Sequence, residues 1–246
     1  MATLNIAHRG GSALGPENTF AAFEKALAAG ADGFEFDLHL SRDGHPVIIH
    51  DETLERTTNG SGPVGEAALE ELQKLDAGSW FGSEFTGARI PALAELFERY
   101  KDKNLLFNAE LKTDIVSYPH LAEAVLKLVS RFGLEERVII SSFNWETLKA
   151  SRTINPKVRT GLLYALEVEN PWDMARELGC YSVHPLFFYL QNPETLARFR
   201  RESIPLYPWT VNDPEMMETF LSEGLEAIIT DYPGELAQLI RARSGR

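Results

Sequence analysis

The chain alternates short apolar runs, rich in β-branched residues, with amphipathic stretches of about 10 to 15 residues. This alternation is typical of repeated βα units, in which helices connect parallel strands. The predicted strands are 4–8, 33–40, 105–112, 138–142, 160–164, 181–184, 206–210 and 227–230. The predicted helices are 17–29, 91–101, 118–132, 144–153, 171–178, 193–202, 214–223 and 234–242. Eight strands and eight helices in a chain of this length predict the α/β class and a (β/α)8 TIM barrel.

Two segments do not fit the alternation of strands and helices: one further apolar run and one long segment after it. Residues 46–50 follow strand 33–40 after the tight-turn signal Asp43-Gly44. The connection is too short for a parallel crossover, so we expect a hairpin that folds back over the second strand. Residues 51–90 then contain Gly and Pro, several aromatics and one short helical stretch. We interpret 51–90 as a small insertion after the second strand, at the barrel mouth.

Composition and charge narrow the functional classes. The 246 residues are 44% hydrophobic and show neither a linker nor a repeat, which predicts one domain over 1–246. There is no apolar run long enough to span a membrane and no leader pattern at the start, so a cytoplasmic location is expected. The net charge of −12 argues against nucleic-acid partners. The single cysteine, Cys180, is interpreted as a structural thiol rather than a nucleophile.

Three acidic residues lie on two successive strands of the predicted barrel. In strand 33–40 the period-2 alternation places Glu35 and Asp37 on one face, and Glu110 takes the same face of strand 105–112. Converging carboxylates repel one another unless a cation neutralises them. All-oxygen ligation favours one divalent cation, Mg²⁺ or Ca²⁺ with Mn²⁺ possible, over zinc. The alternative is a salt-bridge network with Lys112 and Arg9.

Two histidines and two cations surround this acidic cluster in the predicted fold. His8 ends the first strand and His50 ends the hairpin, so both are expected at the barrel mouth. Histidines on either side of a metal site fit general acid and base catalysis, although a lone histidine is more often structural. Arg9 and Lys112 supply local positive charge for a phosphate ester.

Several motifs, in order along residues 8–231, resemble one family, the glycerophosphodiester phosphodiesterases of the bacterial, cytoplasmic type. They are His8-Arg9-Gly10-Gly11, Pro16-Glu17-Asn18-Thr19, Glu35-Phe36-Asp37, His50-Asp51, Arg56-Thr57-Thr58-Asn59-Gly60, Asn108-x-Glu110-x-Lys112, Ser141-Ser142-Phe143, Trp209-Thr210-Val211-Asn212 and Thr230-Asp231.

The resemblance implies a fold, a reaction and a set of site residues. Members hydrolyse small-molecule glycerophosphodiesters, such as glycerophosphocholine or glycerophosphoethanolamine, to glycerol 3-phosphate and an alcohol. The family's metal ligands fall on Glu35, Asp37 and Glu110, its catalytic pair on His8 and His50, and its phosphate contacts on Arg9 and Lys112. Further pocket residues suggested by the similarity are Asn108, Phe143, His184, Trp209 and Asn212.

Other hypotheses stay open on sequence alone. A lysophospholipase D or a phosphoinositide phospholipase on the same barrel would need apolar surface near the mouth, which Trp80, Phe81, Phe85, Phe187 and Phe188 offer. Aldolase or enolase chemistry would use Lys112 but leaves the histidines unexplained. A non-catalytic phosphate-metabolite binding barrel is a further alternative. We lean to His8 as base and His50 as acid; the choice between cyclic-phosphate and direct water attack stays open, and so does the oligomeric state.

Overall fold

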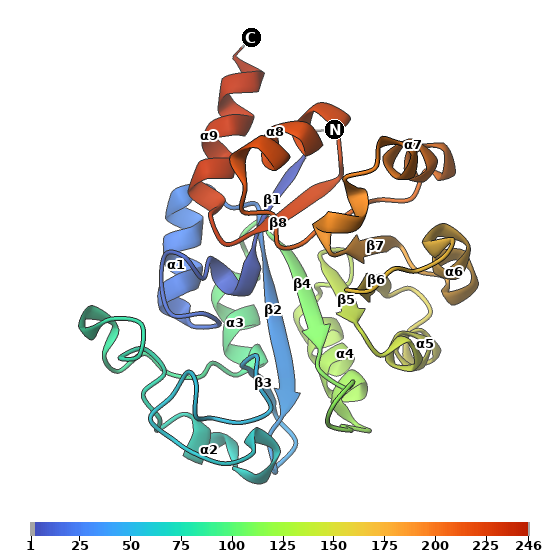
Figure 1. The fold of residues 1–246 in the computed structure, drawn as a ribbon. Coiled ribbons are helices and arrows are strands. Elements are labelled where there is room, and N and C mark those ends of the chain that lie inside the picture. The colour runs from blue at the N-terminus through green and yellow to red at the C-terminus, as the bar shows by residue number, and fades with distance from the viewer. Residues whose placement is uncertain (1–2, 246) are drawn as a thin grey trace.

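Parallel strands form one curled sheet with helices around it. The computed structural model describes residues 3–245 and is drawn in Figure 1. Its strands are β1 (Leu4–Ala7), β2 (Gly33–Leu40), β3 (Pro46–Ile48), β4 (Leu106–Leu111), β5 (Val138–Ser142), β6 (Arg159–Tyr164), β7 (Ser182–Pro185) and β8 (Ala227–Thr230). The spatial order is β7-β6-β5-β4-β2-β1-β8, with β3 paired to β2. The α/β class predicted from the sequence is confirmed.

Residues 205–211 lie between the two edge strands of this sheet. The backbone N–H groups of Tyr207 and Trp209 donate to carbonyls of β7, and Ala227 and Ile229 of β8 donate to Leu206 and Pro208. The sequence predicts a strand at 206–210, but the structure forms only isolated bridges there. Pro205 and Pro208 lack N–H groups, which interrupts a regular ladder. The segment nevertheless joins the two edges of the curled sheet.

The helices follow the predicted order, and α2 is the short helical stretch expected within 51–90. They are α1 (Phe20–Ala29), α2 (Leu69–Leu72), α3 (Leu93–Tyr100), α4 (Leu121–Phe132), α5 (Trp145–Ile154), α6 (Pro171–Leu178), α7 (Pro193–Glu202), α8 (Pro214–Glu223) and α9 (Pro233–Ser244). Asn144, Asn192 and Asp213 each accept a hydrogen bond from a first-turn N–H of α5, α7 and α8. Among residues 3–245, no helix combines the length and the apolar character needed to cross a membrane.

The predicted helix start at residue 17 is wrong. Helix α1 begins at Phe20, and the side chain of Thr19 caps it by accepting from the Ala22 N–H. Asn18 adopts a left-handed conformation with φ of 61°, which is incompatible with a helix. Its side chain instead donates to Asp37 on β2. The residues just before α1 therefore contact the end of β2 instead of extending the helix.

Side chains alternate along β2 between the hydrophobic core, under the helices, and the inner face of the curled sheet. Phe34, Phe36 and Leu38 are fully buried in the main hydrophobic cluster, beneath the surrounding helices. Glu35 and Asp37, at the intervening positions, point to the opposite face, as the period-2 pattern predicts. The strand therefore contributes apolar packing and acidic chemistry from the same eight residues.

The hairpin predicted after the second strand is confirmed. β3 pairs antiparallel with β2, with Leu38 opposite Ile48 and Leu40 opposite Pro46. Residues 51–90 follow, and in Figure 1 they lie beside the lower end of β2, around the label α2. They pack on a small hydrophobic cluster of their own that includes Leu54, Val64 and Leu72. The segment thus lies beside the C-terminal end of β2.

Candidate active site

The three acidic residues singled out in the sequence converge. Glu35 and Asp37 lie on β2 and Glu110 on β4, where parallel register sets Asp37 directly beside Glu110. Each side chain offers an oxygen, and these oxygens all lie within 4.8 Å of one another. All three residues are buried, with 8% or less of their surface exposed. Oxygens at this spacing can together coordinate one hard cation.

The protonation of this cluster reflects crowding of like charges. Burial, together with repulsion from Asp37 and Glu110, raises the pKa of Glu35 well above its ordinary value. Burial and the charge of Asp37 raise the pKa of Glu110 to about 7. Burial would raise the pKa of Asp37 too, but Arg9, His50 and Lys112 lower it below its usual range. One carboxylate is thus fully ionised beside two that resist ionisation until a cation joins them.

Two cationic side chains also reach the acidic cluster, as the salt-bridge alternative predicts. Lys112 Nζ donates to Glu110 Oε1 at 3.0 Å and lies 3.9 Å from Asp37 Oδ1. Arg9 Nε lies 3.6 Å from Asp37 Oδ2, and the Arg9 backbone N–H donates to Glu35 Oε2 at 2.9 Å. Two positive charges can balance only two of the three carboxylates, so one negative charge stays unpaired when all three ionise. A salt-bridge network and a cation site are therefore compatible here.

His8 follows β1, and Asp231 holds its imidazole ring on the side away from the acidic cluster. Its Nδ1 lies 2.6 Å from Asp231 Oδ1, and its Nε2 lies 3.9 Å from Glu35 Oε2. The Asp231 carboxylate also accepts from Ser12 Oγ and Asn212 Nδ2. Although burial acts the other way, these partners lower the pKa of Asp231 to about 2. An ionised carboxylate only accepts, so His8 Nδ1 carries a proton, and Nε2 is the ring nitrogen that faces the cluster.

His50 has the same arrangement on the other side of the cluster. Its Nδ1 lies 2.7 Å from Asp51 Oδ1, and its Nε2 lies 3.5 Å from Lys112 Nζ. The backbone carbonyl of His50 contacts His39 Nε2 at 3.0 Å. His39, buried on the same face of β2 as the acidic residues, thus supports the hairpin end. The two predicted histidines therefore flank the acidic cluster, each with a carboxylate behind it.

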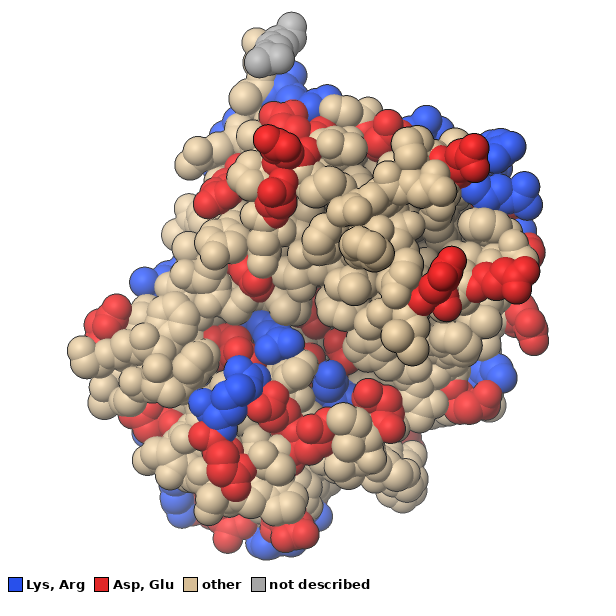
Figure 2. Space-filling model, viewed as in Figure 1, with Lys and Arg blue, Asp and Glu red and all other residues tan. Residues whose placement is uncertain are grey.

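A cavity of about 210 Å³ opens between these groups. It is lined by His8, Arg9, Glu35, His50, Asn108, Glu110, Lys112, Ser141, Phe143, Leu163, Trp209 and Ile229. One wall is charged, and the other is apolar, with the Phe143 and Trp209 rings 5.6 Å apart in an edge-on contact. Figure 2 shows blue and red side chains gathered around a hollow on this face. The cavity suits a small molecule with an anionic end.

Three of the five additional pocket residues lie where the family resemblance suggested. Asn108, Phe143 and Trp209 line the cavity. Trp209 also donates from its indole N–H to the His184 carbonyl, so it lines the cavity and is held against β7. Asn108 Oδ1 and Ser141 Oγ are buried at the cavity without a hydrogen-bond partner in the described part of the chain. Both are available to polar groups of a bound ligand.

His184 and Asn212 are not cavity-lining residues, contrary to expectation. His184 is fully buried in the sheet interior, stacked on Tyr207 with ring centroids 4.8 Å apart and 2.7 Å from Ser182 Oγ. Asn212 is occupied by Asp231, to which it donates at 2.6 Å. Each lies one contact away from a site residue, His184 behind Trp209 and Asn212 behind Asp231. A position at a strand end does not by itself distinguish a residue that lines the cavity from one that packs behind a lining residue.

Sequence reasoning assigned no role to the residues that hold the two histidines. Asp231 is 223 positions from His8 and comes to it only because β1 and β8 are neighbours. Asp51 is adjacent to His50, and this His-Asp pair is the one local signal that was available. Glu17 and Arg56 belong to two of the motifs along the chain, and neither was expected to contact a site residue or the other.

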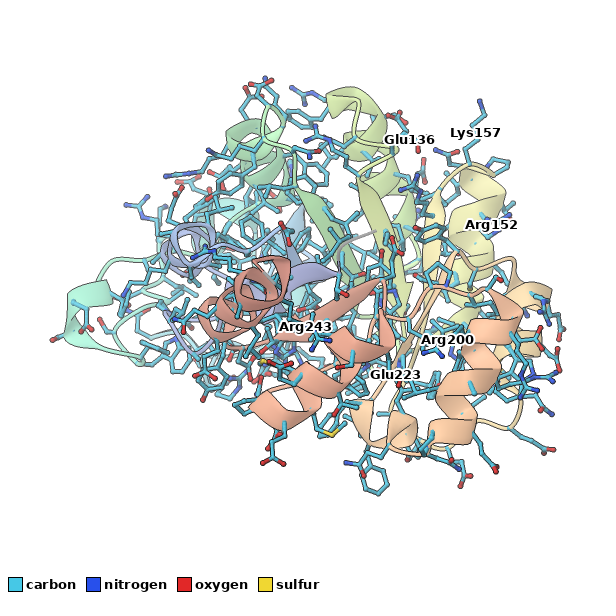
Figure 3. The ribbon with its side chains drawn as sticks, turned by 90° about the horizontal axis from the view of Figure 1, so that it is seen from above. Glu136, Arg152, Lys157, Arg200, Glu223 and Arg243 are labelled. Atoms are coloured by element: carbon cyan, nitrogen blue, oxygen red, sulfur yellow. The ribbon has the colours of Figure 1, made fainter. Side chains whose placement is uncertain are left out.

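A second cavity lies at the opposite end of the sheet. It has a volume of about 240 Å³ and is lined by residues before 206–210 and β8, including Arg200 and Glu223. Figure 3 labels both residues on that side, seen from above. They form an ion pair with each other. This cavity is larger but gathers no histidine or carboxylate cluster among its lining residues.

Burial of His184 predicts a pH-dependent stability. Desolvation lowers its pKa from 6.5 to about 3, so the folded protein keeps it neutral while the unfolded chain binds a proton below pH 6.5. The contribution is complete above pH 6.5 and is lost as pH falls toward 3. We expect wild type to lose about 2 kcal/mol more than His184→Gln between pH 6.5 and 5. Urea unfolding of both proteins across this range measures the difference, and parallel curves would contradict it.

Comparison with known proteins identifies relatives over almost the whole chain. A model of the glycerophosphoryl diester phosphodiesterase family matches residues 8–235. A glycerophosphodiester phosphodiesterase of Caldanaerobacter subterraneus subsp. tengcongensis is 48% identical over 98% of this chain and 99% of its own length. One of Bacillus altitudinis is 33% identical over 95% of this chain and 96% of its own.

Solved structures show the same architecture. A phosphodiesterase of Oleispira antarctica, in complex with the product sn-glycerol-3-phosphate, superposes with a TM-score of 0.88 at 29% identity, covering 96% of each chain. A glycerophosphodiester phosphodiesterase of Agrobacterium tumefaciens gives a TM-score of 0.85 at 30% identity, covering 97% of this chain and 100% of the other.

Proposed function

This chain belongs to the glycerophosphoryl diester phosphodiesterase family and is a phosphoric diester hydrolase, and we propose that it cleaves glycerophosphodiesters such as glycerophosphocholine or glycerophosphoethanolamine. The products would be glycerol 3-phosphate and an alcohol. One observation carries the proposal: three buried carboxylates converge within 4.8 Å, between two histidines whose Nδ1 atoms each contact an aspartate. The product complex of the Oleispira antarctica relative supports a glycerol phosphate as the retained half.

A divalent cation fits the acidic cluster. Glu35, Asp37 and Glu110 would hold it, because their oxygens converge and, among the described residues, no sulfur or imidazole nitrogen joins the group. This donor set favours Mg²⁺, Ca²⁺ or Mn²⁺. When bound, such a cation neutralises the phosphate and lowers the pKa of an attacking hydroxyl.

The side chains around the cluster suit the two ends of a phosphodiester. Arg9 Nε is buried without a hydrogen-bond partner among the described residues, and Lys112 Nζ lies between Glu110 and His50. We assign both to the phosphate oxygens. The apolar wall of Phe143 and Trp209 would face the carbon skeleton of the substrate.

The histidines divide the proton transfers. His8 Nε2 takes the proton of the attacking hydroxyl as its oxygen bonds to phosphorus, and Asp231 stabilises the imidazolium that forms. His50, protonated at Nε2, gives its proton to the leaving alkoxide as the other P–O bond breaks, while Asp51 keeps its ring in place. One proton is taken and one is given, so the net charge of the protein is unchanged, and exchange with solvent restores each histidine to its starting form.

The architecture that we propose for this function is a single (β/α)8 barrel over 1–246 with 51–90 as an insertion at the mouth. The hydrogen bonds of 205–211 to both β7 and β8 support barrel closure. The separate apolar cluster beneath 51–90 supports an insertion without a full core. The cytoplasmic location stays a prediction; Met1 and Ala2, which contributed to it, lie outside the described residues.

Turnover of a substrate panel tests the function. We expect purified protein with Mg²⁺, Ca²⁺ or Mn²⁺ to release glycerol 3-phosphate from glycerophosphocholine or glycerophosphoethanolamine, detected with a coupled dehydrogenase. Addition of EDTA should abolish the signal, and the matching cation should restore it. No cation-dependent release from any diester of the panel would overturn the proposal.

A lysophospholipid is the second candidate substrate, and one observation favours it. Ile115, Leu166 and Phe188, which are 74%, 77% and 61% exposed, follow β4, β6 and β7 at the end where the site residues lie. Exposed apolar side chains around a catalytic mouth can contact an acyl chain. Including long-chain lysophosphatidylcholine in the same panel separates the candidates. Faster turnover of the acylated diester would favour the second candidate.

A further inference from the structure

Arg56, in the segment 51–90, bridges two carboxylates at the cavity mouth. Its Nη1 and Nη2 donate to Glu17 Oε2 and Oε1, both at 2.8 Å. Its Nε and Nη2 donate to Asp51 Oδ2 and Oδ1, at 2.7 and 2.8 Å. Glu17 belongs to the connection between β1 and α1, whereas Asp51 follows the β2–β3 hairpin. One guanidinium therefore ties two separate segments of the chain together.

Each of these carboxylates also contacts a residue of the active site. Asp51 Oδ1 lies 2.7 Å from His50 Nδ1. Glu17 Oε1 accepts from Arg9 Nη1 at 2.9 Å. Arg56 is thus one contact removed from a histidine and from an arginine that line the cavity. The contacts form a continuous chain from His50 through Asp51, Arg56 and Glu17 to Arg9.

The geometry argues against a role of Arg56 as a phosphate ligand. A guanidinium has five N–H donors, and Arg56 makes four hydrogen bonds to the two carboxylates. Only one N–H donor is left, so a bidentate contact to a phosphate would require Arg56 to release Glu17 or Asp51. Arg9 differs, since its buried Nε has no hydrogen-bond partner in the described part of the chain.

We propose that Arg56 is a positioning residue, whose planar guanidinium holds His50 in register through Asp51 and Arg9 through Glu17. The inference rests on the function proposed above for His50 and Arg9. A lysine cannot replace this contact, because a single ammonium cannot form two parallel pairs with two carboxylates. A surface ion pair of this exposure contributes little to folding stability, so the effect should appear in catalysis.

Kinetics of Arg56→Ala and Arg56→Lys test the proposal, with Arg42→Ala as the matched control. Arg42 also anchors this region, through the Glu66 carbonyl and Glu71, and neither of these partners lines the cavity. We expect Arg56→Ala to lower kcat about 10- to 100-fold, the usual effect of removing an outer-shell partner. Arg56→Lys should recover less than tenfold of that loss. Arg42→Ala should keep wild-type kcat, and all three variants should keep the wild-type Tm.

Other patterns would overturn the proposal. An Arg56→Ala variant with wild-type kcat and a raised KM would instead make Arg56 a substrate ligand. Equal losses in Arg56→Ala and Arg42→Ala, with a lowered Tm, would make it a structural tether. A double-mutant cycle adds a sharper criterion: because Arg56 acts partly through Asp51, the losses in Arg56→Ala and Asp51→Asn should be less than additive. Full additivity would contradict the chain of contacts.

A readout without turnover separates this inference from the proposed function. The ¹⁵N imidazole signals of His50 report its tautomer directly. At a pH where the His50 ring is neutral, we expect wild type to show the Nδ1–H tautomer that Asp51 imposes, and Arg56→Ala to show a mixture of the two tautomers. An unchanged His50 spectrum in Arg56→Ala would overturn the positioning role, even if the wild type hydrolysed no diester. A changed spectrum in an inactive wild type would leave only the substrate assignment at fault.

Discussion

Replacing Glu110 with glutamine is expected to abolish diester hydrolysis and yet to stabilise the cation-free protein. The opposite signs follow from one fact: burial and the charge of Asp37 outweigh Lys112 and raise the pKa of Glu110 to about 7. A carboxyl group with a raised folded pKa stabilises below its unfolded pKa near 4.5, and that contribution is lost as pH rises through 7. Above pH 7 the ionised Glu110 therefore costs on the order of 3 kcal/mol, which glutamine removes.

The loss of activity has a different cause. Glutamine removes one of three anionic ligands, and the stabilisation of transition-state charge by a cation is worth several kcal/mol. We expect kcat/KM to fall by at least about 10³-fold. Cation binding, measured by calorimetry with Mg²⁺, Ca²⁺ and Mn²⁺, should weaken in parallel. Glu35→Gln should behave in the same way, since the pKa of Glu35 is also raised.

Denaturant unfolding at pH 8 with EDTA and with cation completes the experiment. Wild type should gain stability from cation according to RT ln(1 + [L]/Kd), whereas Glu110→Gln should gain little. Glu146→Gln, on the exposed first turn of α5, is the matched control and should resemble wild type in every measurement. A Glu110→Gln variant that keeps its activity, or is destabilised in EDTA, would contradict the assignment of this cluster.

The part of this site that the sequence predicts is the part set by local periodicity. Alternation along β2 and β4 is a property of adjacent residues, and it was enough to bring Glu35, Asp37 and Glu110 to one face. The hairpin before His50 followed from the length of one connection. His8 required only the end of a strand. These predictions need no knowledge of which distant segments meet.

The remainder depends on long-range contacts that no local pattern contains. The bond from His8 to Asp231 spans 223 positions, and the bonds from Arg56 to Glu17 span 39. His184 shares the strand-end position of true cavity residues, but it packs against Tyr207 instead of opening to the cavity. Asn18 likewise sits in an apparent helix start, although its side chain is committed to Asp37. Competing tertiary contacts decide such positions.

Removing either histidine is expected to lower kcat for glycerophosphocholine by about 10²- to 10⁴-fold, the usual contribution of a general acid or base. The two variants should nevertheless respond differently to the leaving group. A glycerophosphodiester of p-nitrophenol releases a weakly basic phenolate that needs no proton. If His50 is the acid, His50→Ala should then regain activity to within about tenfold of wild type, while His8→Ala stays impaired because the attacking hydroxyl must still lose its proton.

The two imidazole rings have different neighbours, and these neighbours support His8 as the base and His50 as the acid. His8 Nε2 lies 3.9 Å from Glu35 Oε2, beside the residues that would hold the cation. His50 Nε2 lies beside Lys112, at the opposite wall and next to the segment 51–90. His45→Ala, in the exposed turn between β2 and β3, serves as control, and cation affinity should be retained in all variants. Rescue of His8→Ala instead would reverse the assignment. Equal deficits of both variants on both substrates would remove the acid role from His50, and the leaving alkoxide would then have to take its proton from water.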